Sequence, residues 1–172
     1  MQYMMNNENR KLNNKGLSLI ELIIVLAIMA IIGAASFLSL SMATNRQVSS
    51  CADKIRSTLD QTRNLALGKN SAYMVIWKDD TVKVRIYVNN EPYGGNYIDV
   101  GVGGLDVTYD TNTSTGLTLG NSEATGQIIE FDRSSGGVKG ATYITKFTVT
   151  NGNRTCTVTI DHFTGRITVN NG

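Results

Sequence analysis

The fold is decided by the stretch Lys-Gly-Leu-Ser-Leu-Ile-Glu at residues 15–21. A basic residue and a glycine lead directly into an apolar run. That run continues to residue 40 almost entirely in Leu, Ile, Val, Ala, Met, Phe, Gly and Ser, and Glu21 is its only ionisable side chain. About 20 helical residues span the hydrocarbon core of a bilayer. Residues 17–41 are therefore predicted to form a transmembrane or assembly helix.

This pattern resembles the class III leader of type IV prepilins and pseudopilins. That leader has a basic residue, a glycine and an apolar or aromatic residue, with a glutamate four residues further on. The matching residues are Lys15, Gly16, Leu17 and Glu21, although most members have phenylalanine where Leu17 stands. The resemblance implies cleavage after Gly16 by a membrane-embedded prepilin peptidase, methylation of the new amine on Leu17, and incorporation into a helical filament. Residues 1–16 would then be a leader peptide that is removed on processing.

Glu21 has a physical reason to need a partner. A charged group at the centre of a membrane helix costs about 2.5 to 3.5 kcal/mol, and a carboxylate nearer one end costs less but still favours pairing. Removal of the leader would leave a cationic amine on Leu17, which can pair with Glu21 of a neighbouring subunit. We therefore predict that Glu21 is an assembly residue that fixes the axial register between subunits.

Three other interpretations of this segment stay open. Its basic residues also suit a secretory signal peptide, for which the small residues 33–35 offer a conventional cut before Ser36. A plain membrane anchor would make no special use of Glu21. Ser18 and Glu21 could also form a capping box, since Ser-x-x-Glu ahead of an apolar run satisfies free N–H groups at a helix start. The capping role is compatible with assembly.

Length and charge limit the remaining functions. Removal of residues 1–16 leaves 156 of the 172 residues, which suits one anchor helix and one small domain. The net charge of the whole chain is +2, and the leader holds three basic residues and one acidic residue, so the mature chain is formally neutral. Neutrality argues against strong electrostatic binding to nucleic acid or acidic lipid. His162 and two distant cysteines form no metal-ligand pattern, so no metal and no cofactor is expected.

The sequence also lacks the motifs of common enzyme classes. It contains no nucleophile elbow and no phosphate-binding glycine loop. The glycines at 101, 103 and 104 lack the strand-to-helix setting of a nucleotide-binding loop. We therefore expect that the protein is not an enzyme.

The helix is predicted to continue beyond the apolar run. No proline occurs before Pro92, and no glycine occurs between Gly33 and Gly68. Over residues 42–68 the polarity rises while apolar residues recur every three to four positions. The predicted inward stripe consists of Cys51, Ile55, Leu59, Thr62 and Ala66. Gly68 is the expected end of the helix.

From residue 71 onward, short β-branched and aromatic runs replace the helical pattern. Strands are predicted at residues 73–78, 81–88, 105–109, 127–131, 144–150, 155–160 and 166–169. Asn-Gly at 151–152 is the clearest hairpin signal. Residues 89–104, which hold the only proline, are predicted to be a loop, and residues 110–125 a polar, turn-rich segment.

Many short strands without a second long helix favour an α+β fold. In this pilin-like arrangement, one long N-terminal helix packs on an antiparallel β-sheet domain, and the apolar half of the helix protrudes or lies in the membrane. The globular domain would span residues 42–172. Its helical part would be residues 42–68 and its β-rich part residues 71–172.

The β-rich layout also resembles the minor pseudopilins of the GspH/FimT-like type. The resemblance rests on Arg-Asn-Leu-Ala-Leu at 63–67, Ile-Glu-Phe-Asp at 129–132, Gly-Gly-Val at 136–138, Phe-Thr-Val at 147–149, Val-Thr-Ile at 158–160 and Gly-Arg-Ile at 165–167. It implies a tip or initiator subunit of a secretion pseudopilus, or a subunit that binds DNA during uptake through a Gly-Arg-x-Arg motif.

That DNA-binding motif is incomplete in this chain. Residues 165–168 are Gly-Arg-Ile-Thr, so only the first arginine, Arg166, is present. A phosphate-binding surface needs several basic side chains together, because each contact contributes through counterion release. Arg133, Lys139 and Arg154 could join Arg166 in space. We expect no nucleic-acid partner, and Arg166 is the candidate contact if there is one.

Two states are open for the cysteines. Cys51 belongs to the inward stripe of the helix, and Cys156 is in register with Val158 and Ile160, which should face the core. The pair could form a disulfide that joins the helix to a late strand, or it could be two buried free thiols. Disulfides persist outside the cytoplasm. Closing a loop of about a hundred residues would stabilise the fold by up to about 4.7 kcal/mol.

These observations predict a structural subunit, minor rather than major, of a type IV pilus or a type II secretion pseudopilus. Its expected partners are a prepilin peptidase, other pilin or pseudopilin subunits, and the cytoplasmic membrane. It would be a single-pass membrane protein before it joins a cell-surface or periplasmic filament. The alternatives are a DNA-binding minor pilin that acts in DNA uptake, and a singly anchored surface adhesin.

Overall fold

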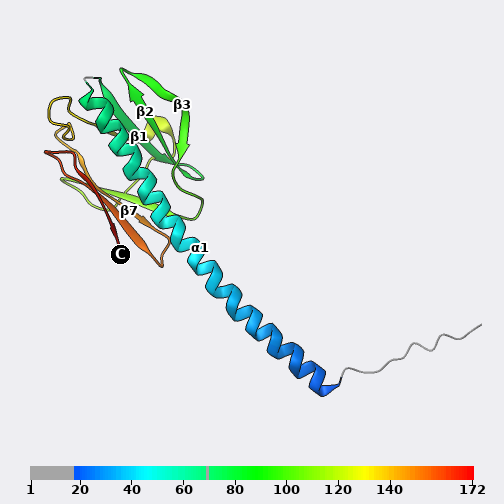
Figure 1. Cartoon of the computed structure of the whole chain (residues 1–172). Coiled ribbons are helices and arrows are strands. Elements are labelled where there is room, and N and C mark those ends of the chain that lie inside the picture. Colours follow the sequence, from blue (N-terminus) through cyan, green and yellow to red (C-terminus); the bar gives the residue numbers. More distant parts are fainter. Residues whose placement is uncertain (1–17, 69) are drawn as a thin grey trace, which may run out of the picture. The chain divides into compact units, whose positions relative to one another are not determined.

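The computed structural model describes residues 18–68 and 70–172, except for the side chains of residues 35–43. The chain divides into two compact units, Met1–Leu40 and Ser41–Gly172. Helix α1 (Leu19–Leu67) contributes residues to both units (Figure 1). In the second unit, the C-terminal part of α1 packs on antiparallel β-sheets. This α+β, pilin-like architecture confirms the predicted fold class.

Helix α1 ends at Leu67, as the sequence predicts. The N–H of Gly68 donates a hydrogen bond of 3.1 Å to the carbonyl of Asn64. All members of the predicted inward stripe are at most 1% exposed, namely Cys51, Ile55, Leu59, Thr62 and Ala66. The buried hydroxyl of Thr62 donates to the carbonyl of Thr58 over 2.8 Å. Because the hydroxyl of Thr62 is hydrogen-bonded within the helix, burial of the stripe leaves this polar group satisfied.

Four strands form sheet A in the order β3-β2-β1-β6, with all neighbours antiparallel. Their bounds are β1 (Ala72–Lys78), β2 (Val82–Val88), β3 (Glu91–Asp99) and β6 (Gln127–Glu130). The β1–β2 hairpin turns at residues 79–80, between the strands predicted at 73–78 and 81–88. The Asp79 carboxylate stabilises this turn, because it accepts a hydrogen bond from the N–H of Thr81 over 3.2 Å and pairs with Lys83 over 2.7 Å.

Five strands form sheet B in the order β5-β4-β7-β8-β9. Their bounds are β4 (Asp106–Thr111), β5 (Leu117–Thr118), β7 (Ile144–Thr150), β8 (Thr155–Ile160) and β9 (Ile167–Asn171), and a short helix η1 (Glu123–Thr125) precedes β6. Strands β7 and β8 have the predicted bounds. Gly152 in the turn between them has φ of 86°, a conformation that glycine adopts readily.

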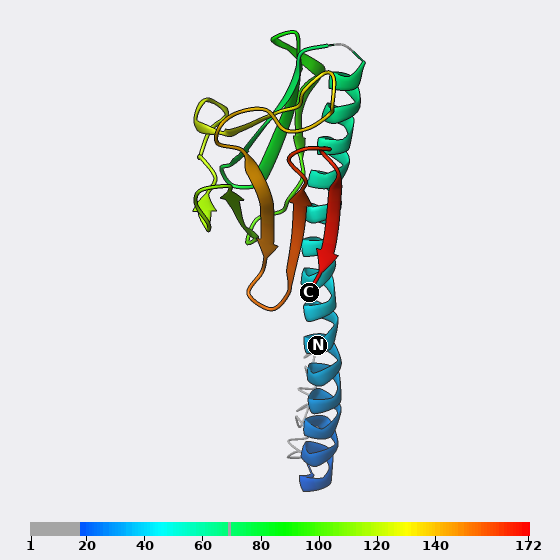
Figure 2. The ribbon, with the colours of Figure 1, turned by 90° about the vertical axis from the view of Figure 1, so that its left-hand side faces the viewer.

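Side chains from α1 and from both sheets meet in one hydrophobic core. Figure 2 shows the C-terminal part of α1 alongside the strands. The core includes side chains that are fully buried on both sheets: Met74, Ile76 and Val84 on sheet A, and Phe147, Val149 and Val158 on sheet B. Burial of one such side chain stabilises a fold by about 1.5 to 3 kcal/mol. The core therefore supplies the main force that holds the second part of α1 against the two sheets.

The loop prediction for residues 89–104 is wrong, because this segment contains β3. Strand β3 lies at the edge of sheet A and is exposed along its whole length. An edge strand tolerates Pro92, since its outer N–H groups have no partner in the sheet. The register of β3 shifts between Tyr93 and Ile98, where Gly94 and Gly95 have φ of 80° and 89°. Residues 110–125, predicted to be irregular, likewise contain β5 and η1.

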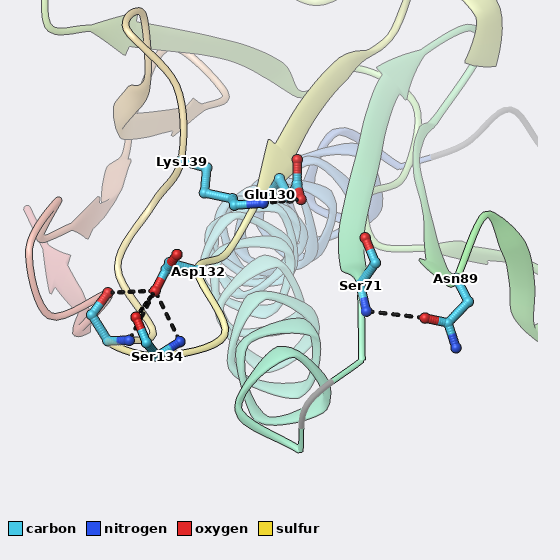
Figure 3. A network of polar contacts seen from close by, with 7 residues as sticks. Ser71, Asn89, Glu130, Asp132, Ser134 and Lys139 are labelled. Carbon is cyan, nitrogen blue, oxygen red and sulfur yellow. Dashed lines mark hydrogen bonds and ion pairs between the residues drawn. The ribbon is translucent and has the colours of Figure 1, made fainter.

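Two turns with the same five-residue pattern recur in the second unit. They are Asp-Arg-Ser-Ser-Gly at residues 132–136 and Asp-His-Phe-Thr-Gly at residues 161–165. In each turn the aspartate carboxylate accepts a hydrogen bond from the N–H three residues later, over 3.0 Å and 2.8 Å (Figure 3 shows the first turn). Each glycine N–H donates to the carbonyl of its aspartate, over 2.9 Å and 2.8 Å.

These hydrogen bonds change the acidity of both aspartates. The hydroxyl of Ser134, together with the N–H groups of its turn, holds the pKa of Asp132 well below its ordinary value. The N–H and hydroxyl of Thr164 lower the pKa of Asp161 in the same way. Both carboxylates are therefore charged at neutral pH, and each accepts several hydrogen bonds within its own turn.

Arg63 of α1 joins the two turns. Its Nε donates to the carbonyl oxygen of Gly136 over 3.2 Å and to that of Thr164 over 3.1 Å. The turns also touch directly, because a Cβ built on Gly165 would lie 1.8 Å from the carbonyl oxygen of Gly136. Only glycine fits at this contact. The connection between β8 and β9 is thus bonded to the C-terminal end of α1.

We expect Arg63→Ala to lower the free energy of unfolding by about 1 to 3 kcal/mol, because two carbonyl groups would lose a charged donor. Arg56→Ala is the matched control on the same helix. Arg56 is exposed, and its ion pair with Asp60, at 3.6 Å, should contribute no more than about 0.5 kcal/mol. Chemical denaturation of both variants measures the difference. Equal destabilisation by the two substitutions would contradict the role given to Arg63.

Candidate functional site

In the Met1–Leu40 unit, the described part of α1 exposes large apolar side chains around the helix. Their exposed fractions run from 43% for Val25 to 76% for Leu19. The full set is Leu19, Ile20, Leu22, Ile23, Ile24, Val25, Leu26, Ile28, Met29, Ile31 and Ile32. Contiguous exposed apolar surface on this scale marks contact with a membrane or with other proteins. This segment is the candidate assembly surface.

Glu21 lies in the first turn of α1 and is exposed. A carboxylate in this position is favoured by the partial positive charge at a helix N-terminus. Ser18 directly precedes the helix, and its carbonyl accepts the first helical bond, from the N–H of Leu22 over 3.1 Å. The position of Glu21 is therefore compatible both with the predicted pairing between subunits and with a capping role. Its function as an assembly residue stays a prediction.

The predicted processing residues Lys15, Gly16 and Leu17 lie outside the described residues. Within residues 18–68 and 70–172, no helix was found that is long and apolar enough to cross a membrane. The predicted membrane span at residues 17–41 stays a prediction.

The two cysteines are buried free thiols in this structure. The Sγ of Cys51 lies beside Gly101, and a Cβ added to Gly101 would lie 3.2 Å from this sulfur. The Sγ of Cys156 donates to Oδ1 of Asn171 over 3.0 Å. Burial raises the pKa of Cys51 to about 12, with a smaller lowering by Lys54. A disulfide between the two cysteines stays a prediction.

The basic residues considered for DNA contact have separate environments. Arg154 directly precedes β8 and Arg166 follows it, so the length of that strand separates them. A strand of six residues spans about 17 to 20 Å. Lys139 pairs with Glu130 over 2.7 Å (Figure 3). Arg154 and Arg166 therefore cannot contact the same phosphate, and no cluster of all four residues forms.

The structure also presents a residue that the sequence interpretation missed. Phe163 is 79% exposed, the largest value among the described large apolar side chains of the Ser41–Gly172 unit. It lies in the 161–165 turn at the position where the 132–136 turn has Ser134. A phenylalanine at the place of a serine in a repeated turn pattern is the signal that could have identified it.

Comparison with known proteins supports the assembly interpretation. Residues 11–37 match the family model described as the prokaryotic N-terminal methylation motif. No curated protein and no solved structure matched the chain. The motif supports a type IV pilin-like or pseudopilin subunit, a structural rather than an enzymatic class. It implies processing by a prepilin peptidase and assembly with other pilin subunits.

We expect Cys51 to react with a thiol reagent at least about a hundredfold more slowly in the folded protein than in urea. The thiolate is the reactive form, and a pKa of about 12 against an unperturbed value of 9.0 keeps it protonated at pH 9. The measurement uses a Cys156→Ala variant, so that only Cys51 is labelled. Equal rates in the folded and unfolded states would contradict the burial of this thiol.

The raised pKa of Cys51 also makes the free energy of unfolding depend on pH. The unfolded thiol releases its proton from about pH 9 upward while the folded thiol retains it, so stability is lost as pH rises between about 9 and 12.

Labelling of the unreduced wild-type protein in urea distinguishes the two cysteine states. Full labelling of both thiols would exclude the disulfide, and labelling only after reduction would establish it.

Proposed function

We propose that this chain is a minor structural subunit of a type IV pilus or a type II secretion pseudopilus. It is cleaved after Gly16 and assembled through its N-terminal helix. The observation that carries the proposal is an apolar helical segment, exposed in the described residues 19–32, within the N-terminal methylation motif. A helix that exposes apolar side chains all round needs an apolar environment on every side.

The mechanism is an exchange of one apolar environment for another. Before assembly, lipid surrounds residues 17–41, and in the filament the helices of neighbouring subunits replace the lipid. Burial from water contributes about 25 cal/mol per Å² of apolar surface, but lipid already solvates this helix. The net gain must therefore come from close packing between helices, from pairing of polar groups, and from the work of an assembly motor.

Glu21 supplies the polar pairing in this mechanism. It is the only ionisable side chain in residues 17–40, and the methylated amine on Leu17 of the next subunit is the proposed partner. A charge pair in apolar surroundings is favourable only when both groups are matched. A subunit that is displaced along the filament axis would leave Glu21 unpaired, so the pair selects one axial register.

The minor role rests on two features of the sequence. The apolar helix lacks a proline, and the β-rich unit resembles the GspH/FimT-like pseudopilins in the runs at residues 129–138 and 158–167. The precursor would be a single-pass protein of the cytoplasmic membrane, and the mature subunit would lie in a cell-surface or periplasmic filament. Its partners are the prepilin peptidase and other pilin or pseudopilin subunits.

Intact mass and N-terminal sequencing of the protein from its native membrane test this proposal. We expect a chain that starts at Leu17 and carries one additional methyl group. A start at Ser36 would show an ordinary secreted protein, and an uncut chain in cells with active prepilin peptidase would show a simple anchor. Either result would overturn the proposal. The amount of the protein in sheared filaments is the second readout, because a minor subunit must be scarce there.

We expect Glu21→Ala and Glu21→Gln to leave cleavage largely intact but to reduce incorporation into filaments by about tenfold, the effect of losing roughly 1.4 kcal/mol of pairing. Fractionation of cells into membrane and sheared filaments measures the ratio. Ser18→Ala is the control, because it removes the capping partner and keeps the carboxylate. If Ser18→Ala reduces incorporation as much as Glu21→Gln, then helix capping rather than pairing between subunits explains Glu21.

A further inference from the structure

A hollow of about 520 Å³ lies on sheet B beside the 161–165 turn. Its lining includes Thr159, Asp161, His162, Phe163, Arg166 and Thr168. Thr159 and Thr168 are exposed partners on β8 and β9, whereas the neighbouring Val158 and Ile160 face the core. The hollow is therefore on the outer face of the sheet. Its volume falls in the range of about 300 to 1,000 Å³ that is typical of small-ligand sites.

An aromatic group forms one wall of the hollow. The ring of His162 stacks on Tyr143, with centroids 3.8 Å apart and an angle of 11° between the planes. Phe163 contacts His162 edge to face, with centroids 5.0 Å apart. Phe163 contacts the ring of His162 while 79% of its surface is exposed, so its ring offers an apolar platform to a ligand.

Polar groups without protein partners lie around this platform. Among the described residues, no side-chain partner is found for the hydroxyls of Thr159 and Thr168 or for the guanidinium of Arg166. Nδ1 of His162 is buried and has no hydrogen-bond partner in the described part of the chain. The carboxylate of Asp161 accepts bonds of 2.8 Å and 2.7 Å from the N–H and hydroxyl of Thr164. The hollow therefore combines hydroxyl groups, one aromatic face, one arginine without an ion pair, and one carboxylate that is already hydrogen-bonded within its own turn.

This combination fits an acidic sugar better than a nucleic acid. A pyranose ring has an apolar face that can lie on Phe163, and its hydroxyls can exchange hydrogen bonds with threonine side chains. A carboxylate on the sugar is the natural partner of Arg166, because guanidinium and carboxylate groups form paired hydrogen bonds. A nucleic-acid strand would need several cations along its backbone, whereas Arg154 lies beyond the other end of β8.

We propose that this hollow is a binding site for an acidic glycan with a uronic acid residue in contact with Phe163 and Arg166. Phe163 supplies the platform, Thr159 and Thr168 bind the sugar hydroxyls, and Arg166 binds the carboxylate. The inference goes beyond the structural role proposed above and does not depend on it, because the hollow lies entirely within the Ser41–Gly172 unit.

Titration of the full chain in detergent micelles tests this site, with NMR chemical shifts as the readout. The probe is a short oligogalacturonate, and the neutral control is a galacto-oligosaccharide of the same length. We expect saturable shifts confined to the hollow, with a dissociation constant on the order of 1 mM for one sugar-sized contact. Phe163→Ala should weaken binding at least about tenfold. Arg166→Gln should reduce the affinity for the acidic probe to that for the neutral one.

Arg133→Gln is the matched control, because Arg133 is an exposed arginine of the 132–136 turn and does not line the hollow. It should leave binding unchanged. Thermal unfolding verifies that each variant folds, and the exposure of Phe163 predicts that it will. Absence of saturable binding, or equal losses in Arg133→Gln and Arg166→Gln, would overturn the proposal. Tighter binding of an oligothymidylate would overturn it in favour of nucleic acid. Self-association that Phe163→Ala abolishes without any sugar would overturn it in favour of a contact between subunits.

Discussion

Packing of one face of α1 against two separate sheets is the interaction on which the globular unit depends. Sheet A presents residues such as Ile76 to this face, and sheet B presents residues such as Phe147. In the described residues no second helix of comparable length covers either sheet, so both inner faces share one helix. The stripe from Cys51 to Ala66 therefore packs against the core side chains of both sheets.

The hydrogen bonds of Arg63 reinforce this arrangement at the end of the helix. Hydrophobic packing is not directional, and a stripe of small and medium side chains permits some sliding. The two carbonyl acceptors lie on the 132–136 and 161–165 turns, so these bonds fix the rotation and the axial position of α1 relative to both turns. The core supplies most of the stabilisation, and this polar contact supplies geometric specificity.

Local sequence predicts the elements whose pattern is regular. Helix α1, the β1–β2 hairpin and the bounds of β7 and β8 follow from period, turn residues and the absence of breakers. Strand β3 could not be found in this way, because an exposed edge strand has no alternating burial and carries Pro92. The division of the strands into two sheets could not be predicted from local patterns either. It depends on β6 pairing with β1 about fifty residues earlier, and local patterns do not specify such partners.

The candidate sites also differ in whether local sequence can identify them. The N-terminal motif and Glu21 are properties of contiguous residues, so the sequence alone identifies them. The helical period does not distinguish the bonding role of Arg63 from that of Arg56, since both lie on the polar side of the pattern. The aromatic group of Tyr143, His162 and Phe163 combines the segment before β7 with a turn after β8. Only the folded chain brings such residues together.

The interrupted edge of sheet A has a consequence for how copies of this protein can associate. A long, flat outer strand would offer its backbone to any similar strand, and stacking of that kind produces disordered aggregates or amyloid. Strand β3 instead carries a proline, an acidic first residue and two left-handed glycines that break its register. These features hinder the edge of sheet A from pairing with the same edge of another copy of the chain.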